Sequence, residues 1–103
     1  MPERNEWNDQ EQTNRVVLEV CAELDRDCAQ AVVKQIKRSL RYAAKPIVLD
    51  LRKAKGLSVM GLAVLFDQAN SAGILRNMEF RLADPVLQRF FINLQAIQTE
   101  FMT

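Results

Sequence analysis

Three short runs rich in apolar residues alternate along the chain with three longer segments whose apolar residues recur every three or four positions. The short runs cover residues 15–22, 47–51 and 78–82, and their length and composition predict β-strands. The run at 47–51 is almost wholly apolar, which favours a central strand of a covered sheet. The run at 78–82 alternates apolar and charged residues, so we expect it nearer an edge.

The first of the longer segments predicts an amphipathic helix. Its apolar positions follow the spacing i, i+3, i+4, i+7 of a stripe that faces a core, and they are Ala29, Val32, Val33, Ile36, Leu40 and Ala43. We expect Asp27 to cap the start of this helix, with Gln30 completing a capping box three positions later. Pro46 prevents any continuation.

The second predicted helix spans residues 58–72 and the third begins at Pro85. The serine that opens the second helix can cap it with its hydroxyl, and Gly73 suits the left-handed residue that follows a helix end. The third helix begins with an aspartate followed by a proline, a typical cap and first helical position. Its expected core-facing stripe consists of Val86, Leu87, Phe90, Phe91 and Leu94. Residues 95–103 are compatible with helix or tail.

The order strand, helix, strand, helix, strand, helix predicts a single α/β domain. The first strand–helix–strand unit implies a parallel pair with a right-handed crossover, so we expect a mixed, mostly parallel sheet of four to five strands packed with helices. The length of 103 residues, 49% of them apolar, suits one domain with one core. We assign residues 15–103 to this domain, and residues 1–14 to a flexible arm or to an edge strand anchored by Trp7.

Residue types that most catalytic and metal sites require are scarce. The chain has no histidine, two cysteines and three glycines, which argues against Ser-His or Cys-His nucleophiles, the usual zinc sites and a glycine-rich phosphate loop. Cys21 and Cys28 are interpreted as small buried hydrophobes. The acidic residues Glu23, Asp25 and Asp27 are interpreted as capping and solvated groups and not as a magnesium site. We therefore expect no enzymatic activity, cofactor or metal.

The distribution of charge along the chain is uneven, although the net charge is only +1. Residues 34–55 contain one acid, Asp50, and eight bases, which are Lys34, Lys37, Arg38, Arg41, Lys45, Arg52, Lys53 and Lys55. Such a stretch attracts acidic partners or is simply a solvated helix face, and we favour the second because only Tyr42 supplies an aromatic ring for stacking on bases. We expect no nucleic-acid binding. No apolar run approaches the ~18 residues of a membrane span, so we expect a cytoplasmic protein without membrane insertion.

Three short motifs narrow the choice among small α/β folds. Ala22-Glu23-Leu24-Asp25 stands where the first helix opens, Ile-Val-Leu-Asp-Leu forms the strand at 47–51, and Gly61-Leu62 follows at the start of the second helix. In this order and spacing they resemble the STAS domain family, whose pattern runs Gly-x-Leu-Asp, a strand ending in Asp-Leu, and Asp-Ser-Ser-Gly-Leu. Asp84-Pro85-Val86 stands where the family has Ser-Pro-x-Val. The resemblance covers about residues 15–101.

The resemblance implies a docking surface and a departure from the usual switch. The family includes bacterial anti-sigma factor antagonists, which dock through the start of the second helix and are expelled when a Ser or Thr there is phosphorylated. The corresponding residues of this chain are Asp25, Asp50, Ser58, Val59, Met60, Gly61 and Leu62. The phosphorylated position falls on Val59, which has no hydroxyl. The switch is therefore missing or moved to Ser58, for which a plain helix cap is the simpler interpretation.

We predict a non-catalytic regulator that binds a serine kinase or anti-sigma factor without the usual phosphorylation control. The alternative is a STAS accessory subunit that binds the ATPase of an ABC-type lipid transporter, and neighbouring genes for a kinase or for a permease would separate the two. A homodimer is compatible with either function. Val59 and Met60 either form an uncharged contact for a partner or face the core, and Asp50 is expected to organise the backbone N–H groups of the loop after its strand.

Overall fold

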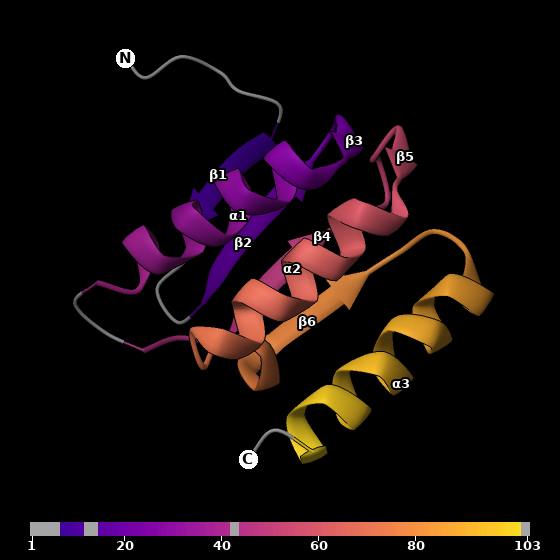
Figure 1. Ribbon diagram of the computed structural model, residues 1–103. Helices are drawn as coiled ribbons and strands as arrows, with labels where there is room; N and C mark the ends of the chain where they lie inside the picture. The colour runs from indigo at the N-terminus through magenta and orange to yellow at the C-terminus, as the bar shows by residue number, and fades with distance from the viewer. Residues whose placement is uncertain (1–6, 12–14, 42–43, 102–103) are drawn as a thin grey trace.

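The computed structural model describes residues 7–11, 15–41 and 44–101 (Figure 1). Its main sheet has the strand order β1 (Trp7–Glu11), β2 (Val16–Val20), β4 (Ile47–Asp50) and β6 (Met78–Arg81). β1 is antiparallel to β2, whereas β2, β4 and β6 are parallel. The short strands β3 (Glu23–Leu24) and β5 (Gly56–Leu57) form a second, parallel sheet. The predicted mixed, mostly parallel sheet is confirmed, with β4 central and β6 at an edge.

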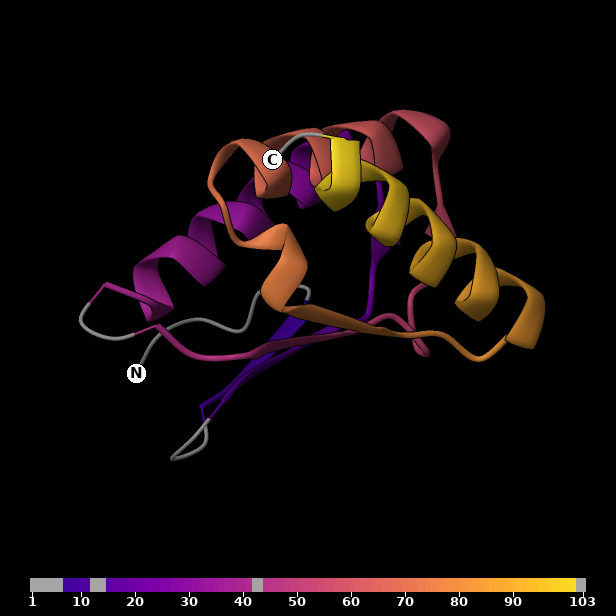
Figure 2. The same cartoon turned by 90° about the horizontal axis from the view of Figure 1, so that it is seen from below.

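Three helices cover one side of the main sheet (Figure 2), and a 3-10 turn, η1 (Leu75–Asn77), precedes β6. The helices are α1 (Arg26–Ser39), α2 (Val59–Ser71) and α3 (Pro85–Phe101). α3 begins at the predicted proline and continues through residues 95–101, which settles them as helix and not as tail. Gly73 has the expected positive φ of 75° after the end of α2. Among the helices of the described ranges, none has the length and apolar character needed to span a membrane.

The hydrophobic core lies between the main sheet and the helices. Alternate residues of β2 and β4 point into it, so that Leu18 and Leu49 are fully buried there, while Val17 and Val48 belong to the opposite face. The core stripe predicted for α1 is confirmed at Ala29, Val32, Val33 and Ile36 and is half-buried at Leu40. Ala43, Tyr42 and the side chain of Trp7 fall outside the part of the chain that the structure describes.

The predicted start of the first helix is wrong by two residues. Asp25, and not Asp27, is the N-cap, since its carboxylate accepts a hydrogen bond of 2.9 Å from the backbone N–H of Cys28. The cause is the pairing of Leu24 with Leu57, which keeps the chain extended through Leu24 and lets the helix begin directly after it. The motif at residues 22–25 is therefore a strand and a cap, and Asp27 is exposed in the first turn.

The cysteines divide between two environments. Cys28 is buried in the core, as expected. Cys21 is only half-buried, and its thiol lies 3.9 Å from a carboxylate oxygen of Glu19. The prediction of a buried hydrophobe is thus wrong for Cys21, because it follows β2 where the chain turns toward β3 and no longer points between sheet and helices.

Glutamine side chains of α3 cover the free edge of β6. The Gln88 amide donates to the carbonyl of Phe80 over 2.6 Å and accepts from the backbone N–H of Leu82 over 2.8 Å. Two helical turns further along α3, the amide of Gln95 donates to the carbonyl of Met78 over 2.6 Å. These contacts satisfy backbone groups that an open edge would leave free, and they hold α3 beside the sheet edge.

Candidate docking site

The start of α2 is tied to the junction of β3 and α1. The backbone N–H and the hydroxyl of Ser58 both donate to the carbonyl oxygen of Leu24, over 3.1 and 3.2 Å. The same hydroxyl accepts from the backbone N–H of Gly61 over 2.9 Å, which caps the helix. The predicted cap is confirmed. Because Ser58 bonds in both directions, the first turn of α2 has a defined orientation on the rest of the domain.

Gly61 allows this close approach. A Cβ atom at this position would collide with the carbonyl oxygen of Leu24 and would lie 2.8 and 2.9 Å from the carbonyl carbons of Leu24 and Asp25. Since all three are backbone atoms, no side-chain rotation could relieve the overlap. Glycine is therefore the residue that lets α2 pack on the start of α1.

The residues just before Gly61 face solvent. Val59 is 86% exposed and Met60 is 58% exposed, which excludes the alternative that they belong to the core. The first turn of α2 carries no acidic residue. The side of α2 that holds Gly61 is pressed against Leu24, so the preceding two side chains are presented outward as an uncharged, apolar contact.

An apolar groove runs between α2 and α3, with a volume of about 390 Å³. The apolar residues that line it are Val59, Leu62, Ala63, Phe66, Phe90 and Leu94. We call it the α2–α3 groove. Asp67 and Gln98 are its polar residues. The exposed start of α2 thus continues into a larger apolar surface, and Val59 belongs to both.

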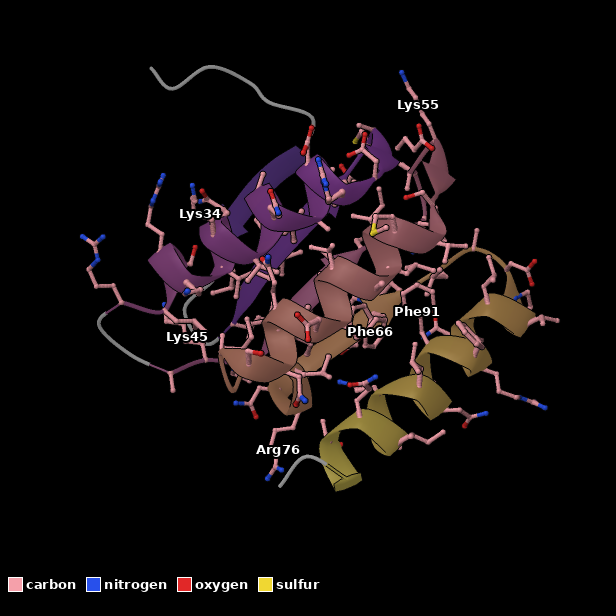
Figure 3. All side chains as sticks on the ribbon, viewed as in Figure 1. Lys34, Lys45, Lys55, Phe66, Arg76 and Phe91 are labelled. Carbon is pink, nitrogen blue, oxygen red and sulfur yellow. The ribbon has the colours of Figure 1, made fainter. Side chains whose placement is uncertain are left out.

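The contribution of α3 to this surface corrects the predicted core stripe. Of its five residues, only Phe91 is fully buried, in a cluster with Phe66 and Phe80 whose ring centroids are 5.3 to 5.7 Å apart. Figure 3 shows Phe66 and Phe91 between α2 and α3. Leu94 is half-buried, and the other three residues are exposed: Val86, Leu87 and Phe90. The sequence does carry a signal for this surface: the apolar residues of α3 cover more of the helix circumference than one buried stripe can hold.

Asp50 forms its hydrogen bonds with Arg52 and with none of the other predicted docking residues in the described part of the chain. Because Leu49 points into the core, the alternation of β4 directs Asp50 to the opposite sheet face. Asp50 accepts from the backbone N–H of Arg52 over 3.0 Å and from its guanidinium over 2.9 and 2.7 Å. The hydrogen bonds and charge of Arg52 lower the pKa of Asp50, against the effect of burial, which raises it. As expected, Asp50 organises the loop that follows β4.

The other predicted residues come together at one place. The carbonyl group of Asp25 packs against Gly61, and the Asp25 side chain caps α1, so Asp25 lies next to the start of α2. Leu62 is half-buried in the α2–α3 groove. The assembled set is Asp25, Ser58, Val59, Met60, Gly61 and Leu62. No group of three or more His, Cys, Asp or Glu residues suited to a metal ion occurs within the described ranges.

The basic stretch at residues 34–55 does not form one surface. Lys34 and Lys45 lie at one end of the molecule and Lys55 lies at the other (Figure 3). Two of the bases that lie between Lys45 and Lys55 in the sequence are paired with acids. Arg52 forms its ion pair with Asp50, and Lys53 lies 3.5 Å from a carboxylate oxygen of Glu19. The structure therefore does not support the interpretation of this stretch as a single electrostatic binding surface.

Comparisons with known proteins agree with this architecture. Comparison with curated protein sequences gives no significant match. Among solved structures, the anti-sigma factor antagonist SpoIIAA in its unphosphorylated form superposes with a TM-score of 0.59 at 14% sequence identity, over 84% of this chain and 81% of SpoIIAA. The crystal structure of Mglu superposes with a TM-score of 0.57 at 18% identity, over 76% of this chain. This chain spans only 19% of Mglu, and both likenesses concern the fold. The family model that describes the STAS domain matches residues 6–86.

Proposed function

This chain belongs to the STAS domain family, and from that premise we propose that it is a non-catalytic regulator that binds another protein through the start of α2. One observation carries the proposal: Val59 and Met60 are exposed apolar side chains on a helical turn that the rest of the domain holds in place. An exposed and pre-ordered apolar turn loses little conformational entropy on binding. The fold shared with SpoIIAA supports the same function.

The proposed docking has no phosphorylation switch of the usual kind. By the resemblance of the sequence motif, Val59 corresponds to the phosphorylated Ser or Thr of the antagonists, and it offers no hydroxyl. The neighbouring hydroxyl of Ser58 donates to Leu24 and accepts from Gly61, so a phosphate there would remove the donated bond and displace the cap. We infer that phosphate at position 59 does not control the bound state and that the Ser58 hydroxyl serves as the helix cap.

The proposed partner is a cytoplasmic serine kinase or anti-sigma factor. The lack of a hydroxyl at position 59 also suits a permanent subunit of a complex, such as a STAS accessory subunit bound to the ATPase of an ABC-type lipid transporter. The two differ in lifetime, because a partner-switching regulator must dissociate and a permanent subunit need not. A measured dissociation rate of the purified complex separates them.

A charge at position 59 tests the docking surface. We expect Val59→Asp to reduce affinity for the native partner at least about tenfold, since a carboxylate would be desolvated in the contact. The fold should persist, because an anion in the first turn is favourable to a helix and exposed substitutions change stability by about 0.5 kcal/mol or less. Affinity capture from the native host identifies the partner, and calorimetry with the purified partner gives the affinity.

Ile92→Asp is the matched control. Ile92 is a β-branched residue that is 53% exposed on α3, and it does not line the α2–α3 groove. Its replacement should leave the affinity unchanged. Equal affinities of the wild-type protein and Val59→Asp, with both proteins folded by circular dichroism, would refute the proposed docking surface.

A further inference from the structure

We propose that the α2–α3 groove binds an amphipathic helix of the partner protein, with the apolar face of that helix in the groove and a Lys or Arg side chain paired with Asp67. The inference rests on the proposed function, because Val59 is common to both surfaces. It adds the secondary structure and the charge of the bound segment.

The groove exists because α3 meets α2 mainly through Phe91 and Phe66, while its hydrogen bonds hold it at the sheet edge. Gln88 and Gln95 bond to the backbone of the β6 region, and Phe91 is the one residue of α3 that is fully buried among those described. Phe90, the residue before it, is 49% exposed and lines the groove. Hydrogen bonds to β6 thus set the position of α3, and apolar side chains of both helices are left without a covering layer.

The length of the groove fits the repeat of a helix. From Val59 to Asp67 its α2 side spans about 12 Å, or roughly two turns. Two turns present residues i, i+3 or i+4, and i+7 of a partner helix on one face, which is the set of anchors used when a helix docks in a groove. The volume of about 390 Å³ leaves room for a few such side chains and not for a folded domain.

The charge of the groove selects among apolar occupants. Asp67 is its only ionisable lining residue, is exposed, and forms no ion pair or hydrogen bond with any residue in the described ranges. A cationic side chain placed there gains a Coulombic interaction. A fatty-acid carboxylate or an acidic helix would be repelled. The complementary segment is therefore apolar on one face, with a basic residue near the end that meets Asp67.

Selection from a displayed library of helical peptides tests this directly. With the full chain as target, we expect enriched peptides to share large apolar residues at i, i+3 or i+4, and i+7, followed by Lys or Arg. Ala63→Arg, which places a long charged side chain in the groove, should weaken the selected peptides at least about tenfold. Enrichment of peptides without this pattern, or equal binding to Ala63→Arg, would overturn the inference.

A charge exchange tests the pairing with Asp67. We expect Asp67→Lys to weaken the selected peptides about fivefold at low salt, and replacement of the peptide Lys or Arg by Glu to restore binding to that variant. Asp27→Lys is the control, because it makes the same change of charge at an exposed aspartate of α1 outside the groove. Equal weakening by both variants would show a general charge effect and no pairing.

Other occupants give different results. If the chain dimerises in sedimentation experiments and Ala63→Arg abolishes the dimer, the groove binds a second copy and the inference fails. If dodecanoate vesicles bind the wild-type protein and displace the selected peptides, the groove is a lipid site and the inference also fails. Loss of native-partner binding in Val59→Asp, with full binding in Ala63→Arg and Asp67→Lys, would refute the groove while keeping the proposed function.

Discussion

The two sides of α2 differ in how they are packed. Toward α1, Gly61 brings the helix against the backbone of Leu24 and Asp25, and α1 buries a full stripe of apolar residues. Toward α3, Phe91 packs against Phe66 of α2, and it is the one residue of α3 that is fully buried among those described. The α1 side is an interface made during folding, whereas the α3 side retains exposed apolar surface, which we propose binds another molecule. On that proposal, apolar residues of one helix stabilise the fold on one side and bind a partner on the other.

The neighbouring residues Phe91 and Phe90 should show the largest contrast. We expect Phe91→Ala to lower the free energy of unfolding by about 3 to 5 kcal/mol, because it leaves a cavity beside Phe66 and Phe80. Phe90→Ala should cost less than about 1 kcal/mol, since its side chain is half exposed. Urea denaturation measures both. Similar losses would mean that α3 packs as a core helix, and the distinction between the two sides would be lost.

Substitutions at two glycines test how closely α2 approaches the backbone at the start of α1. We expect Gly61→Ala to lower the free energy of unfolding by about 3 kcal/mol, since the added methyl group meets backbone atoms of Leu24 and Asp25. Gly56→Ala is the control, because a Cβ atom there would lie 3.6 Å from Glu23, an ordinary contact. Thermal and urea denaturation compare the two variants. A Gly61→Ala protein as stable as Gly56→Ala would contradict the close approach.

Two glutamines of α3 should show the smallest difference. Gln88→Ala leaves the carbonyl of Phe80 and the N–H of Leu82 without their side-chain partner, so we expect a loss of about 1 to 3 kcal/mol and faster hydrogen exchange at the Leu82 amide. Gln98→Ala should be nearly neutral, because Gln98 lines the groove and forms no hydrogen bond with a described residue. Unchanged exchange at Leu82 would show that the glutamine does not hold α3 at the sheet edge.

The site could be predicted from the sequence only in part. Ser58 and Gly61 were identified by a cap pattern and a motif, and both contribute to the start of α2 as expected. The groove was missed, because the apolar residues of α3 were all assigned to the core. Phe90 and Phe91 are adjacent and chemically identical, and nothing in their local sequence states which of them faces Phe66.

The sequence by itself determined the features that depend on neighbouring residues. Strand and helix periodicity, the cap at Ser58, the proline that opens α3 and the left-handed Gly73 all arise from backbone preferences within a few positions. The tertiary structure decided whatever depends on contacts between distant segments. The pairing of Leu24 with Leu57 fixes the cap at Asp25, and the bonds from Gln88 to the backbone of Phe80 and Leu82 hold α3 at the sheet edge. Burial is a property of the assembled fold, so only the fold could place Val59 and Phe90 at the surface.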